Sequence, residues 1–143
     1  MSTNRRRKNI IFLCTGNSCR SQMAEGYLRY FAGDKAYIYS AGVEARGVNS
    51  LAMTVMQEDG IDISGHTSNH MREYHLIDFD FVLTLCDPAK ESCPLLPKNI
   101  KQIHVTFDDP GKATGSHEKR MQKFRKVRDE IKAFTKQFAE EYL

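Results

Sequence analysis

The sequence lacks any apolar run near the roughly 20 residues that a membrane-spanning helix requires. It also lacks a secretory signal, because the basic segment MSTNRRRKN is followed only by IIFL, which is shorter than the apolar core of such a signal. We therefore expect a cytoplasmic protein with no membrane partner. The 143 residues are enough for one domain and too few for two, so we expect a basic tail at 1–8 and a single domain at 9–143.

The chain has no strong excess of charge of either sign. Its formal net charge is +3 at pH 7, and most of the imbalance lies in the basic residues at 5–8. No interleaving of aromatic and basic residues and no recognition module for nucleic acids accompanies this cluster. We therefore predict no nucleic-acid partner and interpret residues 1–8 as a solvated extension.

Cysteines are few, and their spacing disfavours two common roles. A cytosolic protein keeps its thiols reduced, so four cysteines do not predict a disulfide framework. Neither Cys14 and Cys19 nor Cys86 and Cys93 form the tight Cys-x2-Cys pairs that are typical of structural zinc sites. We infer that reactive thiols are present.

The order of the apolar segments predicts a three-layer α/β fold. Four segments indicate strands: 9–13, 36–42, 78–85 and 100–105. Helices are predicted from 21 to about 31, from 49 to 60, and along a last segment with apolar residues at helical spacing: Phe124, Val127, Ile131, Phe134 and Phe138. The alternation of strands and helices predicts a parallel sheet with helices on both faces. Residues 108–120 are rich in Gly and Pro and predict a surface loop.

The stretch CTGNSCRS, residues 14–21, lies between the first predicted strand and the first predicted helix. Ligands of open α/β sheets bind outside the carboxyl ends of the strands, and the N-terminus of a helix attracts anions. Gly16 and Asn17 tolerate the left-handed backbone that a tight curl requires. We therefore predict that six residues surround an oxyanion: Thr15, Gly16, Asn17, Ser18, Cys19 and Arg20.

Cys14, Arg20 and Ser21 suit an attack by sulfur on that oxyanion. The field at the helix N-terminus favours a thiolate at Cys14. Arg20 can direct two donors to two oxygens of a tetrahedral oxyanion, and the hydroxyl of Ser21 can donate to the thiolate. The pattern therefore predicts a nucleophilic cysteine with an oxyanion clamp.

Such an attack also needs a proton donor for the leaving oxygen. Asp108 and Asp109, followed by Pro110, lie beyond the fourth predicted strand, where a loop can reach the same edge of the sheet. On sequence alone this segment fits a simple turn better than a catalytic acid, and only the need for a proton donor, together with the resemblance described next, favours the acid.

These residues resemble the low-molecular-weight protein tyrosine phosphatase superfamily, in which Cys-x5-Arg-Ser comes early and an Asp-Pro acid comes late. Within it, the sequence is more similar to the thioredoxin-coupled arsenate reductases than to the phosphatases. The matching motifs follow in order along most of the chain: CTGNSCRSQMAEG, YSAG, GVN, IDISGHTS, VLTLC, CPLLP, FDDP and VRDEI. The resemblance implies a four-stranded parallel sheet, Cys14 as nucleophile, Arg20 as clamp and Asp109 as acid. We expect a monomer.

The reductases differ from the phosphatases at Cys86 and Cys93. A phosphatase needs one thiol because water resolves its adduct, whereas reduction of arsenate to arsenite takes two electrons and hence two thiols. The resemblance implies a relay from Cys14 to Cys86 to Cys93 that thioredoxin recycles, in the service of arsenic detoxification and with no covalently bound cofactor. Cys19 matches a position that is not required for the reduction.

The spacing of Cys86 and Cys93 predicts a change of structure. A helix over 86–93 would separate its ends by roughly 10 Å, whereas a disulfide needs Cα atoms within about 7 Å. We therefore predict a helix in the reduced protein and a loop in the oxidised protein.

Two features distinguish the sequence within the resemblance. It has no tryptophan, and Gly111 follows Asp109-Pro110 where the phosphatases carry an aromatic residue, which favours a small oxyanion such as arsenate, with phosphate and sulfate as competitors. Some of the reductases hold a potassium ion, and the resemblance implies these ligands: Asn17, Glu25, Ser40 and Thr67. Asn69 stands where those members have an aspartate.

Two other functions fit parts of the sequence. One is a phosphatase that hydrolyses phosphate monoesters through a Cys14 phosphoenzyme, and weak activity of this kind is expected in the same site. The other is a non-catalytic anion-binding or redox-sensing module in which Cys86 and Cys93 report oxidation. The absence of tryptophan, and of an aromatic residue after Asp109-Pro110, disfavours the phosphatase. Asp109 disfavours the sensor, because a sensor needs no general acid.

Overall fold

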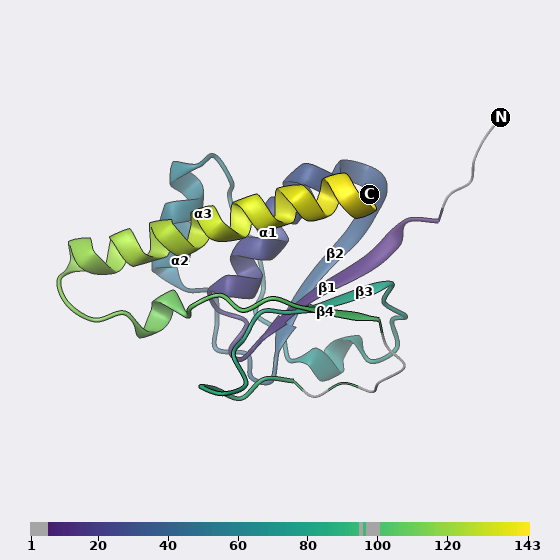
Figure 1. Cartoon of the computed structure of the whole chain (residues 1–143), viewed down its shortest axis with the longest axis horizontal. Helices are drawn as coiled ribbons and strands as arrows, with labels where there is room; N and C mark the ends of the chain where they lie inside the picture. The colour runs from purple at the N-terminus through teal and green to yellow at the C-terminus, as the bar shows by residue number, and fades with distance from the viewer. Residues whose placement is uncertain (1–5, 95, 97–100) are drawn as a thin grey trace.

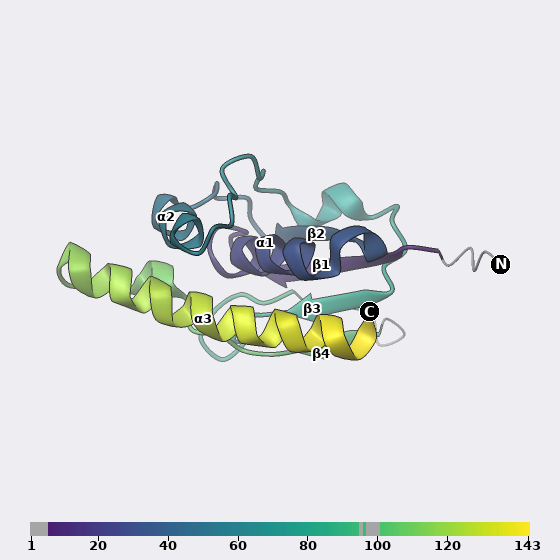
Figure 2. The ribbon, with the colours of Figure 1, turned by 90° about the horizontal axis from the view of Figure 1, so that it is seen from above.

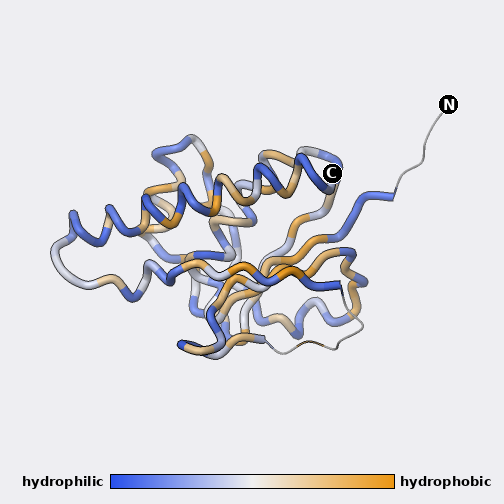
Figure 3. Tube along the Cα trace, viewed as in Figure 1, coloured by the Kyte–Doolittle hydropathy of each residue, from blue (hydrophilic) through white to orange (hydrophobic). Residues whose placement is uncertain are grey.

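Strand β1 lies inside the sheet because its side chains from Ile10 to Cys14 are apolar and buried on both faces, and the middle of the sheet carries the hydrophobic colour in Figure 3. The computed structural model describes residues 6–94, 96 and 101–143. Within these ranges four parallel strands run in the order β2-β1-β3-β4: β1 (Lys8–Cys14), β2 (Ala36–Gly42), β3 (Phe81–Thr84) and β4 (Gln102–His104). The predicted four-stranded parallel sheet is confirmed.

Helices cover both faces of this sheet, but unequally. The helical segments are α1 (Arg20–Ala32), η1 (Gly33–Lys35), α2 (Ser50–Glu58), η2 (Met71–Tyr74), η3 (Pro110–Lys112) and α3 (His117–Tyr142), of which the three η segments are 3-10 helices. The α-helices share a buried cluster with Ile10 and Phe12 of β1, whereas Ile11 and Leu13 belong to a second cluster against which η2 packs. Figure 1 shows the α-helices on one side of the sheet and η2 on the other.

Helix α3 begins inside the segment that the sequence predicted as a loop, 108–120. The prediction was wrong there because Ser116 starts the helix: its hydroxyl accepts a hydrogen bond from the Lys119 amide at 3.2 Å. Figure 2 shows the first turns of α3 extending past the sheet. Although α3 has 26 residues, neither it nor another helix within the described residues is apolar enough to cross a membrane.

Strands β3 and β4 are shorter than the predicted segments 78–85 and 100–105, and the first position of the second segment lies outside the described residues. Asp80 explains the later start of β3. Its carboxylate accepts a hydrogen bond from the Asn9 amide at 2.8 Å and forms an ion pair with Arg6 at 2.6 Å. The Asp80 side chain therefore binds the residues at the start of β1. Part of the predicted tail is therefore anchored.

Candidate active site

The loop between β1 and α1 directs its carbonyl groups away from the cavity described below. Three carbonyls accept hydrogen bonds of 2.9, 3.0 and 3.1 Å from amides of the segment 44–49: Thr15 from Glu44, Gly16 from Arg46, and Ser18 from Asn49. At Cys19, the N-cap of α1, no side chain caps the helix. The loop therefore offers its amide hydrogens, and not its carbonyl oxygens, to an anion at the helix N-terminus.

Asn17 holds the loop in shape. It adopts the left-handed backbone that the sequence predicted, with φ of 47°. Its side-chain oxygen accepts from the Asn69 amide at 2.7 Å, and its side-chain nitrogen lies 2.9 Å from both Ser21 Oγ and Ser40 Oγ. Because Asn17 is completely buried, these hydrogen bonds hold the turn in one conformation.

Two glycines lie in close contacts around the loop, one against a flexible side chain and one against the backbone. Gly16 does not adopt the predicted left-handed backbone, but a Cβ there would lie 2.8 Å from Cδ of Arg46. At Gly42, the last residue of β2, a Cβ would lie 2.7 Å from the Thr15 oxygen and 2.8 Å from the Asn17 nitrogen. These latter neighbours are backbone atoms, so the loop itself would have to move.

Replacing Gly42 by alanine is expected to lower the free energy of unfolding by about 1–3 kcal/mol, the usual cost of overpacking. Chemical denaturation measures this loss. Gly65→Ala is the matched control, because a Cβ there meets no atom within 4 Å. Equal stability of the two variants would contradict the assignment of Gly42 to the support of the loop.

Cys14, at the end of β1, is paired with Ser21 in the first turn of α1. Its sulfur lies 2.9 Å from Ser21 Oγ, and both residues are buried. Since Ser21 Oγ accepts from Asn17, its own hydrogen is available to the sulfur. A hydroxyl donor in this position stabilises the negative charge of a thiolate, which is the nucleophilic form of cysteine.

Arg20 is buried and reaches two carboxylates. Its two terminal nitrogens, Nη1 and Nη2, lie 2.7 and 2.6 Å from the two carboxylate oxygens of Glu91, and Nη2 lies 3.7 Å from Asp109. Arg20 Nε is buried without a hydrogen-bond partner among the described residues. Asp109 is held at the start of η3, where it accepts from the Gly111 amide at 2.9 Å.

A cavity of about 210 Å³ brings several of the predicted residues together. Its lining is Cys14, Gly16, Ser18, Cys19, Arg20, Arg46, Asn49, Asp109, Gly111 and Lys112. A nucleophilic sulfur, a guanidinium and a carboxylate therefore face a space that suits a small tetrahedral oxyanion. Two predicted oxyanion-binding residues do not line it, since Thr15 turns its hydroxyl to Glu91 and Asn17 lies beneath the loop.

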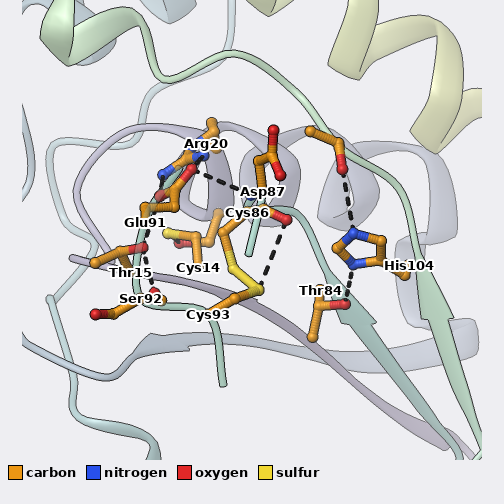
Figure 4. The surroundings of a disulfide bond; sticks show 12 residues. Cys14, Thr15, Arg20, Thr84, Cys86, Asp87, Glu91, Ser92, Cys93 and His104 are labelled. Carbon is orange, nitrogen blue, oxygen red and sulfur yellow. Dashed lines mark hydrogen bonds and ion pairs between the residues drawn. A yellow bond between two sulfur atoms is a disulfide. The ribbon is translucent and has the colours of Figure 1, made fainter. Parts of the chain in front are cut away.

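Cys86 and Cys93 form a disulfide with their Cα atoms 5.7 Å apart (Figure 4). The segment between them makes turns and contains no helix, and the amides of Lys90 and Glu91 both donate to the Asp87 carbonyl at 3.0 Å. The structure thus shows the loop that was predicted for the oxidised protein. The helix of the reduced protein stays a prediction.

Known proteins match the chain over almost its whole length. The family model for low molecular weight phosphotyrosine protein phosphatase matches residues 9–142. The chain belongs to this phosphatase family. It is 52% identical over 134 residues to an arsenate reductase of Shouchella clausii, which covers 94% of this chain and 96% of the relative. The corresponding Bacillus subtilis enzyme is 50% identical over 133 residues, 93% of this chain and 96% of that protein.

A solved structure of an arsenate reductase in the phosphate binding state is also similar, with a TM-score of 0.78 at 33% identity, covering 95% of this chain and 99% of that one. The fold and the family that the sequence predicted are therefore confirmed. Within the phosphatase family, the chain is similar to arsenate reductases, as its motifs indicated.

Cys19 shares the phosphatase-family loop with Cys14 but has a different environment. Burial raises the pKa of the Cys19 thiol to about 12, and the negative charge of Asp109 acts in the same direction. The thiol therefore stays protonated at neutral pH and is a poor nucleophile. This environment fits the passive role that the resemblance implied for Cys19.

Three of the residues implied as potassium ligands are joined by hydrogen bonds, Asn17 to Ser40 and Ser40 to Glu25, whereas the fourth, Thr67, binds other residues. One carboxylate oxygen of Glu25 accepts from Ser40 at 2.6 Å, and the other accepts from Arg29 at 2.9 Å. Thr67 donates to the side chain of Asn69 at 2.7 Å. Because a guanidinium already supplies the positive charge, the set does not fit a potassium site as arranged, and we derive no step through that ion.

Sequence reasoning missed three residues of the cavity and the partner of Arg20. Arg46 directly precedes the GVN motif and Asn49 is its last residue, so the motif marked their neighbourhood without indicating that they line the cavity. No pattern in the sequence indicated a role for Lys112 or Glu91, because contacts between distant parts of the chain bring them to the site.

Proposed function

We propose that this protein reduces arsenate to arsenite and uses three of its cysteines in a relay. The observation that carries the proposal is the Cys86–Cys93 disulfide beside the loop of Cys14 and Arg20. Hydrolysis of a phosphoester needs one thiol, whereas a two-electron reduction needs a pair. The similarity to arsenate reductases over almost the full length of the chain supports the same reaction.

In the first step the Cys14 thiolate attacks arsenic, and an arsenate oxygen leaves as water with a proton from Asp109. Arg20 and the loop amides neutralise the negative oxygens during this attack. The product is a thiol–arsenate adduct. Its formation does not change the oxidation state of arsenic.

In the second step the Cys86 thiolate attacks the Cys14 sulfur. The sulfur–sulfur bond forms, the sulfur–arsenic electron pair passes to arsenic, and arsenite leaves. Cys93 then attacks Cys86 and releases Cys14 as a thiolate. Arsenic gains two electrons and two thiols lose them, so the step balances.

The disulfide must finally meet a reductant, for which we propose reduced thioredoxin. Cys14 is buried in the loop, whereas Cys93 is half-buried. Transfer of the disulfide from Cys14 to Cys93 therefore moves it toward solvent, where a protein dithiol can attack it.

The relay predicts that Cys93→Ser stalls after about one turnover. We would measure arsenite formed with thioredoxin, thioredoxin reductase and NADPH. The wild type and the control Cys19→Ser should turn over many times, because Cys19 has no place in the relay. Multiple turnover by Cys93→Ser would remove Cys93 from the mechanism.

Weak hydrolysis of phosphate monoesters is a second activity of this site, favoured by membership of the phosphatase family. It would pass through a Cys14 phosphoenzyme that water resolves. Steady hydrolysis of p-nitrophenyl phosphate by a wild type that forms no arsenite would make this the main function.

A further inference from the structure

The carboxylate of Glu91 occupies a built binding site. It accepts from both terminal nitrogens of Arg20, from Thr15 Oγ1 at 2.6 Å and from the Asp87 amide at 3.1 Å (Figure 4). The side chains of Glu91 and Arg20 are only 8% and 3% exposed. Four donors therefore converge on one buried carboxylate.

This contact uses donors that an oxyanion would need. A guanidinium binds carboxylate and tetrahedral oxyanions in the same way, with two parallel hydrogen bonds from one edge. Glu91 takes the edge formed by Nη1 and Nη2 of Arg20, and Nε has no hydrogen-bond partner in the part of the chain that the structure describes. The negative charge of Glu91 also opposes a second anion beside Arg20.

We propose that Glu91 competes with the oxyanion for Arg20 while the Cys86–Cys93 bond is closed, so that the oxidised protein binds arsenate weakly until it is reduced. This inference rests on the oxyanion site of the proposed function. Glu91 would thereby clear the site after arsenite has left and prevent a new arsenate from binding when no thiol pair is ready to reduce it.

The disulfide holds Glu91 in this position. Cys86 is fixed at the sheet, because the amide of its neighbour Leu85 donates to the Leu13 carbonyl at 2.9 Å. Closing the bond draws Cys93 back to Cys86 and lays the preceding residues against the loop, where the Ser92 carbonyl oxygen also lies 2.6 Å from Thr15 Oγ1. Opening the bond removes this tether.

Glu91 keeps its charge over the whole physiological range. Burial alone would raise its pKa, but the hydrogen bonds from Arg20, Thr15 and the Asp87 amide outweigh burial and lower the pKa to about 2. The competition therefore depends on the redox state and not on pH near neutrality.

Titration with inorganic phosphate tests the inference, with the amide NMR shifts of residues 15–20 as the readout. The wild type and Glu91→Gln are each titrated in the reduced form and in the Cys86–Cys93 disulfide form. We expect the oxidised wild type to bind phosphate about tenfold more weakly than the reduced wild type, and Glu91→Gln to recover most of that loss. The reduced forms should agree within about twofold.

Glu44→Gln is the matched control, because Glu44 is an exposed carboxylate that pairs at 2.6 Å with Arg46 of the same cavity. It removes one charge near the site without touching Arg20. Equal affinity of the oxidised wild type and oxidised Glu91→Gln would overturn the inference, as would an equal gain in Glu44→Gln. If the reduced wild type shows no phosphate shifts at residues 15–20, the oxyanion site of the proposed function fails as well. Glu91→Ala, which cannot accept at all, should shift affinity in the same direction.

Discussion

Replacing Cys14 by serine is expected to lower arsenate reduction by at least about a thousandfold and to abolish p-nitrophenyl phosphate hydrolysis. The substitution keeps the size of the side chain and its contact with Ser21 but removes the thiolate. The side-chain partner of this position is the hydroxyl of Ser21, which is not a base that could activate a serine. Arsenite formation with the thioredoxin system and release of p-nitrophenol measure the two losses.

Cys19→Ser is the control within the same loop. Cys19 is also buried and also lines the cavity, so the two variants differ in the role of the thiol and not in its location. We expect Cys19→Ser to retain at least about a third of wild-type turnover. Comparable activity of the two variants would show that Cys14 is not the nucleophile.

Replacing Asp109 by asparagine is expected to lower the turnover of arsenate by about 10²- to 10³-fold, the range for loss of a general acid. An asparagine oxygen can still accept from the Gly111 amide, so the start of η3 should stay intact. The lost function is the proton for the departing oxygen. Steady-state kinetics with arsenate, thioredoxin and NADPH measure the effect.

Asp108→Asn separates this loss from a general effect of charge. Asp108 is the preceding residue, but its exposed carboxylate pairs with Lys123 at 2.8 Å. We expect it to change turnover by no more than about twofold. Normal arsenate reduction by Asp109→Asn would show that Asp109 is not the general acid. If neither the wild type nor the two variants form arsenite, and all three still form the Cys86–Cys93 disulfide with peroxide, the protein is a redox sensor and not a reductase.

The parts of the fold and the site that are local in sequence could be predicted. Residues 14–21 contain the proposed nucleophile, the proposed oxyanion clamp and the turn within one strand–loop–helix unit, so their spacing was enough to predict that Cys14, Arg20 and Ser21 lie close together. The apolar periodicity of residues 124–138 likewise indicated the core face of α3.

Features that depend on distant contacts could not be predicted. Glu91 reaches Arg20 across 71 positions, and its placement requires the path of the chain between two bonded cysteines. The boundaries of α3 and β3 were wrong because one polar side chain decided each of them. Ser116 caps α3 inside a segment whose Gly and Pro content predicted a loop. Asp80 binds Arg6 and the Asn9 amide through its side chain, although it lies in a segment that was predicted as a strand.

The register of the sheet pairs Leu13 of β1 with Thr84 of β3, so that Cys14 is the last residue of β1 and Cys86 lies two residues beyond the end of the adjacent strand β3. Residues at the carboxyl ends of neighbouring parallel strands lie at the same edge of the sheet, and the spacing between the strands sets the distance between them. On this scaffold the proposed reduction and the hydrolysis typical of phosphatases require no difference in fold. The proposed relay needs only a resolving thiol beyond the adjacent strand and a second thiol seven residues later, which would give a phosphate-binding loop access to electrons.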